Sequence, residues 1–312
     1  MVDMPSHAGS SVSFDTDLIV VGGGPAGCAA ARMAASVGMR SVVIEPDRLC
    51  RNLYRIAALN NVLGGYSSGL DLADAMTAEL RATELCRLEL GRRVVELRAD
   101  DDRVAVVLDD GTRLVAPYAV VGTGVGPLQP HDVPWITAPA GLLLPPLWEV
   151  EADDAEGRTL LVLGGDRPIG TFLRAHPALD VRLVVVHPEA DAYKVEEIRD
   201  DPRVTLLPVD HVTLHPVERT AIAAGVLMAD GTRRDLSAAA AYLSLGNAPT
   251  APPGDLLRGP DGYCPPKDQH ARLIVAGDLR STRYQRIMTA LGSGAEAALR
   301  AYYAARGRPE RV

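Results

Sequence analysis

The stretch from Asp17 to Glu45 constrains the fold more than any other part of the sequence. It reads DLIVVGGGPAGCAAARMAASVGMRSVVIE, in which a short apolar run leads into the triplet Gly22, Gly24 and Gly27. An alanine-rich segment and a second apolar run at 41–44 follow, and Glu45 closes the stretch. The order of strand, glycine triplet, helix, strand and acid predicts a βαβ unit of the kind that binds a dinucleotide.

Each part of this stretch has a mechanical reason. Gly22 permits the tight turn after the strand, Gly24 lets the backbone approach a pyrophosphate, and Gly27 lets the helix pack close to the strand. The free N–H groups at the N-terminus of the helix then meet the phosphates. Glu45 lies 23 residues after Gly22, where an acidic side chain accepts hydrogen bonds from an adenosine ribose in the usual pattern.

Composition limits the partners and the location that we expect. The 312 residues suffice for two domains of ordinary size. The net charge of −8 is spread without a basic stripe, which argues against a nucleic-acid partner. No apolar run reaches the roughly 18 residues that span a bilayer, and the N-terminus lacks the features of a signal peptide. We therefore expect a cytoplasmic protein with no membrane partner.

The cysteines suggest neither a disulfide framework nor a metal site, because Cys28, Cys50, Cys86 and Cys264 are widely spaced. Cys28 follows Gly27 on an alanine-rich helix, where a buried, small apolar role is the expected one. Cys50 lies in the connection after Glu45, and it is the one thiol for which chemistry is worth considering beside a packing role. The sequence offers no metal ligands and no identifiable catalytic residue.

Further strand–turn–helix units follow along the chain. The strand at 119–121 runs into a glycine turn at 122–124, and a second unit of nucleotide-binding type begins at Thr159. Periodicity also predicts helices at 70–85 and 287–306, a hairpin at 104–116, and strands at 92–98, 181–186, 204–207, 241–245 and 273–276. The fold class predicted is α/β, with two Rossmann-like, three-layer domains, the second inserted into the first. The expected boundaries are 1–126 with 251–312 for the first domain and 127–250 for the second.

Four separated stretches together resemble thioredoxin reductase-like flavoproteins. They are the triplet with Glu45, the exit turn at 122–124, the exit turn at 246–249, and Gly277-Asp278 followed by Gln285 and a glycine-bearing helix. The resemblance covers nearly the whole chain in the right order. Arg51-Asn52 and the segment 61–65 further resemble the branch of this family that oxidises small dithiol metabolites. Because the family forms homodimers, the resemblance also implies a homodimer.

The resemblance implies FAD in the first domain. Arg51 and Asn52 are counted among the cofactor-binding residues, and a helix N-terminus near Gln285 would place positive dipole beside the flavin. Carried over by position, the other residues are Gly22, Gly24, Pro25, Ala26 and Gly27 at the pyrophosphate, Glu45 at the ribose, Val95 at the adenine, Thr123 and Gly124 beside the cofactor, Gly277 and Asp278 at the ribityl chain, and Gln285, Arg286 and Ile287 at the isoalloxazine.

Two departures from the family pattern change the expected chemistry. The C-x-x-C of the disulfide-reducing members is replaced by Leu-Pro-Pro-Leu at 144–147, so this segment cannot carry thiol–disulfide exchange. In the second unit, Asp166 takes the place of the second glycine, and His187 is followed by Pro188 and Glu189 instead of arginines. This pattern argues against NADPH, and slightly less against NADH, as electron donor. The alternative is a reshaped turn around 167–168 that still admits a nucleotide.

The leading hypothesis for function is an FAD-dependent oxidoreductase that oxidises a small molecule, possibly of specialised metabolism, directly at the flavin, with O2 or another acceptor. The first alternative is an NAD(P)H-dependent reductase of ferredoxin or free flavin, which also lacks the redox disulfide. The second alternative is a non-catalytic, dimeric FAD-binding protein.

Overall fold

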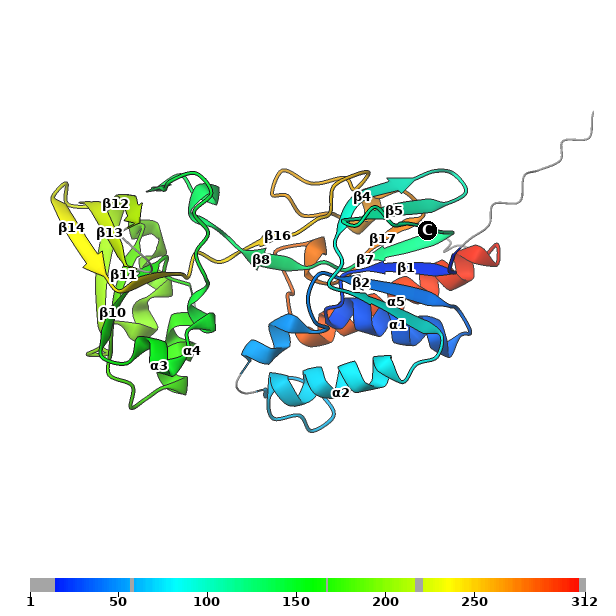
Figure 1. Ribbon diagram of the computed structural model, residues 1–312, viewed down its shortest axis with the longest axis horizontal. Helices are drawn as coiled ribbons and strands as arrows, with labels where there is room; N and C mark the ends of the chain where they lie inside the picture. Colours follow the sequence, from blue (N-terminus) through cyan, green and yellow to red (C-terminus); the bar gives the residue numbers. More distant parts are fainter. Residues whose placement is uncertain (1–14, 57–58, 167, 217–220, 309–312) are drawn as a thin grey trace, which may run out of the picture. The chain divides into compact units, whose positions relative to one another are not determined.

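The computed structural model describes residues 15–56, 59–166, 168–216 and 221–308. The chain divides into two compact units (Figure 1): unit 1 comprises Met1–Val125 and Pro249–Val312, and unit 2 comprises Gly126–Ala248. The segments in which the chain leaves and re-enters unit 1 form two short strands that pair with each other, β8 (Val125–Pro127) and β16 (Asn247–Pro249). Two Rossmann-type units, one inserted in the other, confirm the predicted fold class.

Unit 1 is built around a five-stranded parallel sheet with the order β17-β7-β1-β2-β3. An antiparallel sheet of three strands, β4-β5-β6, forms a further layer. The elements are β1 (Leu18–Val21), α1 (Pro25–Ser36), β2 (Ser41–Glu45), a 3-10 turn η1 (Arg51–Arg55), α2 (Gly69–Arg81), β3 (Cys86–Leu90), β4 (Val94–Ala99), β5 (Val104–Leu108), β6 (Arg113–Ala116), β7 (Tyr118–Val121), β17 (Leu273–Val275), η7 (Gly277–Arg280) and α5 (Ile287–Ala305).

The alternation of side chains between the two faces of β1 explains the three layers of unit 1. Leu18 and Val20 belong to a core cluster with residues of α1, α2 and α5. Ile19 and Val21, on the other face, belong to a cluster with residues of β4, β5 and β6. Since successive side chains of a strand point to opposite faces, a strand with four buried apolar residues must be covered on both sides.

The order of the strands fixes where unit 1 can bind a ligand. β1 lies in the middle of the parallel sheet, with β2 on one side and β7 on the other. Ligands of open parallel sheets bind outside the carboxyl ends of the strands, at the point where the strand order reverses. Gly22, Gly122 and Gly277 follow the strand ends of β1, β7 and the β17 segment, so they meet at this edge.

One strand of unit 1 was not predicted. The helix expected at 70–85 ends at Arg81, and the chain then forms β3 at the edge of the sheet, parallel to β2. The side chain of Ser68 accepts a hydrogen bond from the Asp71 N–H at the start of α2, as an N-cap residue does. β3 carries the charged residues Arg87 and Glu89, which suit an edge strand and hide it from a search for apolar runs.

Unit 2 contains a seven-stranded mixed sheet with the order β14-β13-β12-β11-β10-β15, and β9 pairs with β12. β15, β10, β11 and the start of β12 are parallel, whereas β12, β13 and β14 are antiparallel. The elements are β9 (Ile136–Thr137), α3 (Ala152–Ala155), β10 (Arg158–Leu163), α4 (Pro168–Ala175), β11 (Val181–His187), β12 (Val204–Pro216), β13 (Ile222–Met228), β14 (Arg233–Ala238) and β15 (Ala240–Leu243). None of the helices in the described ranges of either unit combines the length and apolar character that a bilayer span requires.

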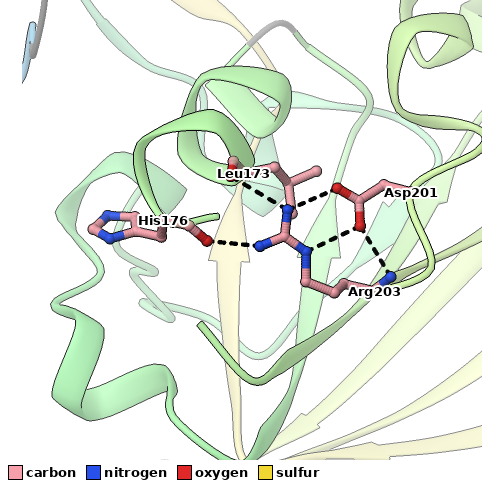
Figure 2. A network of polar contacts seen from close by, with 4 residues as sticks. All are labelled: Leu173, His176, Asp201 and Arg203. Carbon is pink, nitrogen blue, oxygen red and sulfur yellow. Dashed lines mark hydrogen bonds and ion pairs between the residues drawn. The ribbon is translucent and has the colours of Figure 1, made fainter. Parts of the chain in front are cut away.

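Arg203 ties the end of α4 to the loop before β12 (Figure 2). Its guanidinium donates to the carbonyl oxygens of Leu173, at 3.2 Å, and His176, at 2.7 Å, which are among the carbonyls that a helix end leaves unpaired. The same group donates to both carboxylate oxygens of Asp201, at 3.0 and 2.7 Å. These hydrogen bonds lower the pKa of Asp201, and they hold the short helix in place behind the second glycine turn.

Candidate functional site

The carboxyl edge of the parallel sheet in unit 1 brings its glycine turns into contact. Gly22 has a φ of +99°, and a Cβ added to it would lie 2.6 Å from the carbonyl oxygen of Gly122. Gly277, with a φ of +69°, is equally tight, because its Cβ would lie 2.9 Å from the Cβ of Ala26. The turns after β1, β7 and β17 therefore pack on one another and on the first turn of α1.

The N-terminus of α1 is open at this edge. Gly24 is its N-cap, with φ −74° and ψ −176°, and no side chain caps the helix. A Cβ added to Gly24 would meet no described atom within 4 Å, whereas one added to Gly27 would lie 1.8 Å from the Gly22 carbonyl oxygen. Gly27 is thus needed for packing and Gly24 leaves free space. Free space in front of uncapped N–H groups and the positive end of the helix dipole suits a phosphate.

Thr123 presents a buried polar atom to this region. Its Oγ1 is buried and has no hydrogen-bond partner among the described residues. Its backbone oxygen accepts from the Thr250 hydroxyl at 2.8 Å, and the carbonyl of Gly124 accepts from the Thr250 N–H at 3.0 Å. A buried hydroxyl without a hydrogen-bond partner costs free energy of folding. A polar ligand at this edge, next to Gly22, would supply the missing partner.

Glu45 lies beside the turn, where the spacing places it. One carboxylate oxygen accepts from the Gly23 N–H at 2.7 Å, and the other accepts from the Asp47 N–H at 3.1 Å. Burial raises the pKa of Glu45, and these two backbone donors act in the opposite direction. Each oxygen still has lone-pair capacity for a further donor. A role toward an adenosine ribose stays a prediction.

Asp278 follows β17 at the same edge of the sheet, directly after Gly277. Burial raises the pKa of Asp278 in η7, and the charges of Arg280 and Arg286 act to lower it. The Gln285 amide donates to the carbonyl of Ser281 at 3.0 Å and to the Tyr263 hydroxyl at 3.2 Å. Asp278 and Gln285 are therefore fixed on one segment, directly ahead of α5.

The remaining predicted residues are spread around this core. Arg286 is the N-cap of α5, and Ile287 is its first residue. Arg51 pairs with Asp47 at 3.1 Å, and Asn52 Oδ1 accepts from Arg55 at 3.3 Å within η1.

Val95 lies outward on β4, with 43% of its surface exposed. The glycine turns, Glu45 and Thr123 lie close together in the structure. Asp278 and Gln285 lie at the same edge of the sheet. A role of Val95 toward the adenine stays a prediction.

Sequence reasoning missed two features of the site. Ser293 on α5 accepts from the Gly277 N–H through its hydroxyl at 2.9 Å, which holds the turn after β17. Cys28 and Cys50 bring their sulfur atoms within 3.6 Å of each other, directly behind Gly23. A small-residue run in α5 was a signal for the first feature, but nothing in the spacing of the cysteines indicates the second.

Gly164 in the second glycine turn is held as Gly22 is in the first. Gly164 has a φ of +93°, and its Cβ would lie 2.4 Å from the carbonyl oxygen of Ser244, as that of Gly22 does from Gly122. The Asp166 N–H donates to the same Ser244 oxygen at 3.0 Å. The neighbouring Gly165 faces Val195, whose Cγ1 would lie 2.6 Å from an added Cβ. Gly23 in the first turn faces Leu49 in the same way, because the Leu49 Cδ2 would lie 2.6 Å from an added Cβ. The difference between the two turns is therefore Asp166 in place of Gly24.

A cavity of about 620 Å³ adjoins this second turn. It is lined by Asp166, Tyr193, Lys194, Glu196 and Glu197. Burial acts to lower the pKa of Lys194, but the hydrogen bond with Asp191 and the charge of Asp166 raise it overall. Arg199 pairs with Glu196 at 2.7 Å, and Arg174 pairs with Glu197 at 3.6 Å. The carboxylate of Asp166, in place of the second glycine, makes this turn a poor site for a pyrophosphate.

The segment in place of a C-x-x-C is structural. Leu147 is completely buried in the core of unit 2, together with residues of β10, α4 and β11. Pro146 forms an isolated bridge with Leu243 of β15. This segment packs against the sheet and offers no reactive group.

Comparisons with known proteins agree with this architecture. The model of the family described as Glucose inhibited division protein A matches residues 17–84. The ferredoxin–NADP reductase of a Nocardioides species is 29% identical over 186 residues, covering 55% of each chain. An NADH dehydrogenase of Ferdinandcohnia aciditolerans is 24% identical over 311 residues, covering 92% of this chain and 57% of the relative. The chain spans about half the length of the curated relatives it matches.

Solved structures match over almost the full length. Thioredoxin reductase from Lactococcus lactis in its FR conformation gives a TM-score of 0.71 at 16% identity, covering 92% of this chain and 98% of that one. Bacillithiol disulfide reductase from Staphylococcus aureus gives 0.66 at 11% identity, covering 94% and 100%. The chain has the thioredoxin reductase-like fold of FAD/NAD(P) oxidoreductases, which confirms the family resemblance of the sequence at the level of the fold.

Proposed function

We propose that this chain is an FAD-dependent oxidoreductase without a redox disulfide, which oxidises a small molecule directly at the flavin with O2 or another acceptor. The observation that carries the proposal is the contrast between the two glycine turns. Gly24 leaves open space in front of α1, whereas Asp166 and a carboxylate-lined cavity stand at the second turn. The turn at Gly24 is suited to the pyrophosphate of a dinucleotide, and the turn at Asp166 is not.

The residues of unit 1 fit FAD. Gly22, Gly24 and Gly27, with Pro25 and Ala26, would hold the pyrophosphate at the N-terminus of α1. Glu45 would accept from the adenosine ribose, and the unpartnered Thr123 hydroxyl would find a polar partner. Asp278 would accept from the ribityl chain. When bound, FAD accepts two electrons from an organic substrate and passes them to an acceptor.

Charge at the far end of the site suits this chemistry. Arg286 and the N-terminus of α5 supply positive charge and positive dipole next to Gln285. Such groups favour negative charge nearby, whether on a reduced ring or on an anionic substrate. The chain's own contribution is therefore to bind, orient and polarise, and electrons need no relay through residues 144–147. A homodimer is part of the proposal, on the family resemblance alone.

A second candidate function is a nicotinamide-dependent reductase of ferredoxin or free flavin. The observation that favours it is the set of curated relatives named ferredoxin–NADP reductase, at 26–29% identity. The carboxylate of Asp166 opposes it, because it repels the phosphates of NADPH. Electron entry from NADPH or NADH distinguishes the two candidates.

The test of the leading proposal measures whether the reduced flavin passes its electrons to an acceptor. The protein is saturated with FAD, freed of unbound flavin, photoreduced without oxygen, and mixed with aerated buffer. We expect the visible absorption of oxidised flavin to return together with hydrogen peroxide, or to return when a quinone is added as acceptor. Flavin that stays reduced with both acceptors would contradict an oxidase or dehydrogenase and favour the non-catalytic alternative.

A second sample of the FAD-saturated protein, left oxidised and kept without oxygen, can be mixed with dithiothreitol as a probe for small dithiol substrates. We expect loss of visible flavin absorption if the dithiol-oxidase resemblance extends to the substrate class. Protein carrying Gly24→Asp, treated in parallel, serves as the control without bound flavin.

A further inference from the structure

Cys28 and Cys50 form a thiol pair behind the first glycine turn. Cys28 lies in the first turn of α1, and Cys50 lies directly before η1. Their Sγ atoms are 3.6 Å apart, although the rest of α1 and the whole of β2 lie between the two residues in the sequence. Only 2% of Cys28 and 1% of Cys50 is exposed. The described part of the chain places neither Cys86 nor Cys264 in such a pair.

Both cysteines hold the same atom of the dinucleotide turn. The carbonyl oxygen of Gly23 accepts from the Cys50 N–H at 2.8 Å and from the Cys28 thiol at 3.3 Å. Gly23 in turn donates its N–H to Glu45. The pair is therefore attached to the residue between Gly22 and Gly24, on the side of the turn away from the open space.

The backbone at Cys50 is held in an unusual conformation. Its φ is +56°, in the left-handed region that side chains other than glycine rarely adopt. Such a conformation persists only where the surroundings fix it. Here it turns the chain so that the Cys50 N–H reaches Gly23 and the sulfur reaches Cys28.

We propose that Cys28 and Cys50 are a redox pair, which forms a reversible disulfide when the protein meets hydrogen peroxide. A disulfide has an S–S distance of about 2.05 Å, so the sulfur atoms must approach from 3.6 Å. The bond would tie the first turn of α1 to the segment after β2, across the back of the dinucleotide turn.

The reaction balances with peroxide as the two-electron oxidant. The Cys50 thiolate attacks one peroxide oxygen and breaks the O–O bond, which gives a sulfenic acid and hydroxide. The Cys28 sulfur then attacks the Cys50 sulfur, and the S–O bond breaks as water leaves. Two thiols and one peroxide become one disulfide and two waters.

The order of attack follows from the hydrogen bond that the Cys28 thiol donates to the Gly23 carbonyl at 3.3 Å, which holds the proton on Cys28. The hydrogen bond with Cys50, followed by burial, raises the pKa of the Cys28 thiol well above its usual value. A thiol that keeps its proton is the poorer nucleophile. Cys50 therefore attacks first, and Cys28 resolves the sulfenic acid.

Peptide mapping after peroxide treatment of the folded, full-length protein tests the pair. We expect wild-type protein to lose two thiols, to yield a peptide pair linked through Cys28 and Cys50, and to recover both thiols with dithiothreitol. The unfolding temperature should rise on oxidation and fall back on reduction, because the bond closes a loop of the unfolded chain. The result does not depend on flavin turnover, so it separates from the test of the proposed function.

Single-residue variants show which of the two cysteines attacks peroxide and which one resolves the sulfenic acid. With dimedone present, Cys28→Ala should trap a sulfenic acid on Cys50, and Cys50→Ala should leave Cys28 unmodified. Cys264→Ala removes a buried thiol outside the pair and should behave as wild type. Circular dichroism confirms that each variant is folded before treatment, and Cys28→Ser replaces Cys28→Ala if the alanine variant is unfolded. A wild-type protein that is oxidised at Cys86 with no linked peptide would overturn the proposal.

Discussion

Replacing Gly24 by aspartate is expected to abolish FAD binding without weakening the fold. A Cβ at Gly24 meets no described atom within 4 Å, and the backbone there has a φ of −74° that any residue adopts. Aspartate is a favoured N-cap residue, so the stability of the flavin-free protein should stay constant or rise by a few tenths of a kcal/mol. The substitution reproduces, at the first turn, what Asp166 does at the second.

The loss of affinity follows from charge and space together. A carboxylate about 5 Å from one phosphate charge, at an effective dielectric constant of about 20, costs on the order of 3 kcal/mol. That alone weakens the Kd for FAD by roughly a hundredfold. Fluorescence titration of the flavin-free protein with FAD measures the change. Gly24→Ala, which adds volume without charge, should lie between wild type and Gly24→Asp.

Ser36→Asp is the matched control for charge. Ser36 is exposed at the opposite end of α1, so the same charge is added to the same helix far from the turn. This variant should bind FAD as wild type does. Equal affinities of Gly24→Asp and Ser36→Asp for FAD would rule out the turn as the pyrophosphate site.

Replacing either of two glycines in α5 by alanine should change the free energy of unfolding, and the two changes should have opposite signs. A Cβ at Gly294 would lie 1.9 Å from the Ala26 carbonyl oxygen, a backbone atom of α1 that cannot move aside cheaply. A Cβ at Gly292 would meet nothing within 4 Å. Gly292→Ala should therefore raise the free energy of unfolding by about 0.5–1 kcal/mol. Gly294→Ala should lower it by about 1–3 kcal/mol or more, because the two helices are forced apart.

Urea unfolding of the flavin-free variants, followed by far-UV circular dichroism, measures both changes. The chain's two tryptophans, Trp135 and Trp148, both lie in unit 2. Tryptophan fluorescence therefore reports on unit 2, and its transition should move less than the transition in ellipticity. If Gly294→Ala were as stable as Gly292→Ala, the close packing of α1 on α5 would be refuted.

Much of unit 1 is predictable because its signals are local. The strand at Leu18, the turn at Gly22 and the helix from Pro25 are encoded within one continuous stretch, and the structure confirms them. Glu45 could be located beside the turn from its spacing alone. The strand β3 could not, since Arg87 and Glu89 replace the apolar residues by which strands are recognised.

Features that depend on distant parts of the chain were not predictable. The Asp166 substitution is visible in the sequence, but the cover that Val195 lays over Gly165 depends on how the segment after β11 folds back. The approach of Cys50 to Cys28 likewise requires the left-handed backbone at Cys50. Spacing gives no indication of either contact, because each is set by packing against another element.

The most direct test of the account is a visible absorption spectrum of the purified protein, repeated without oxygen after adding NADPH and then NADH. The account predicts the absorption bands of bound oxidised flavin and no rapid loss of them with either nucleotide, since the carboxylate of Asp166 disfavours a pyrophosphate at the second turn. A protein that neither carries nor takes up flavin would contradict the assignment of the first turn. Rapid bleaching by NADPH or NADH would contradict the assignment of the second and establish the nicotinamide-dependent alternative.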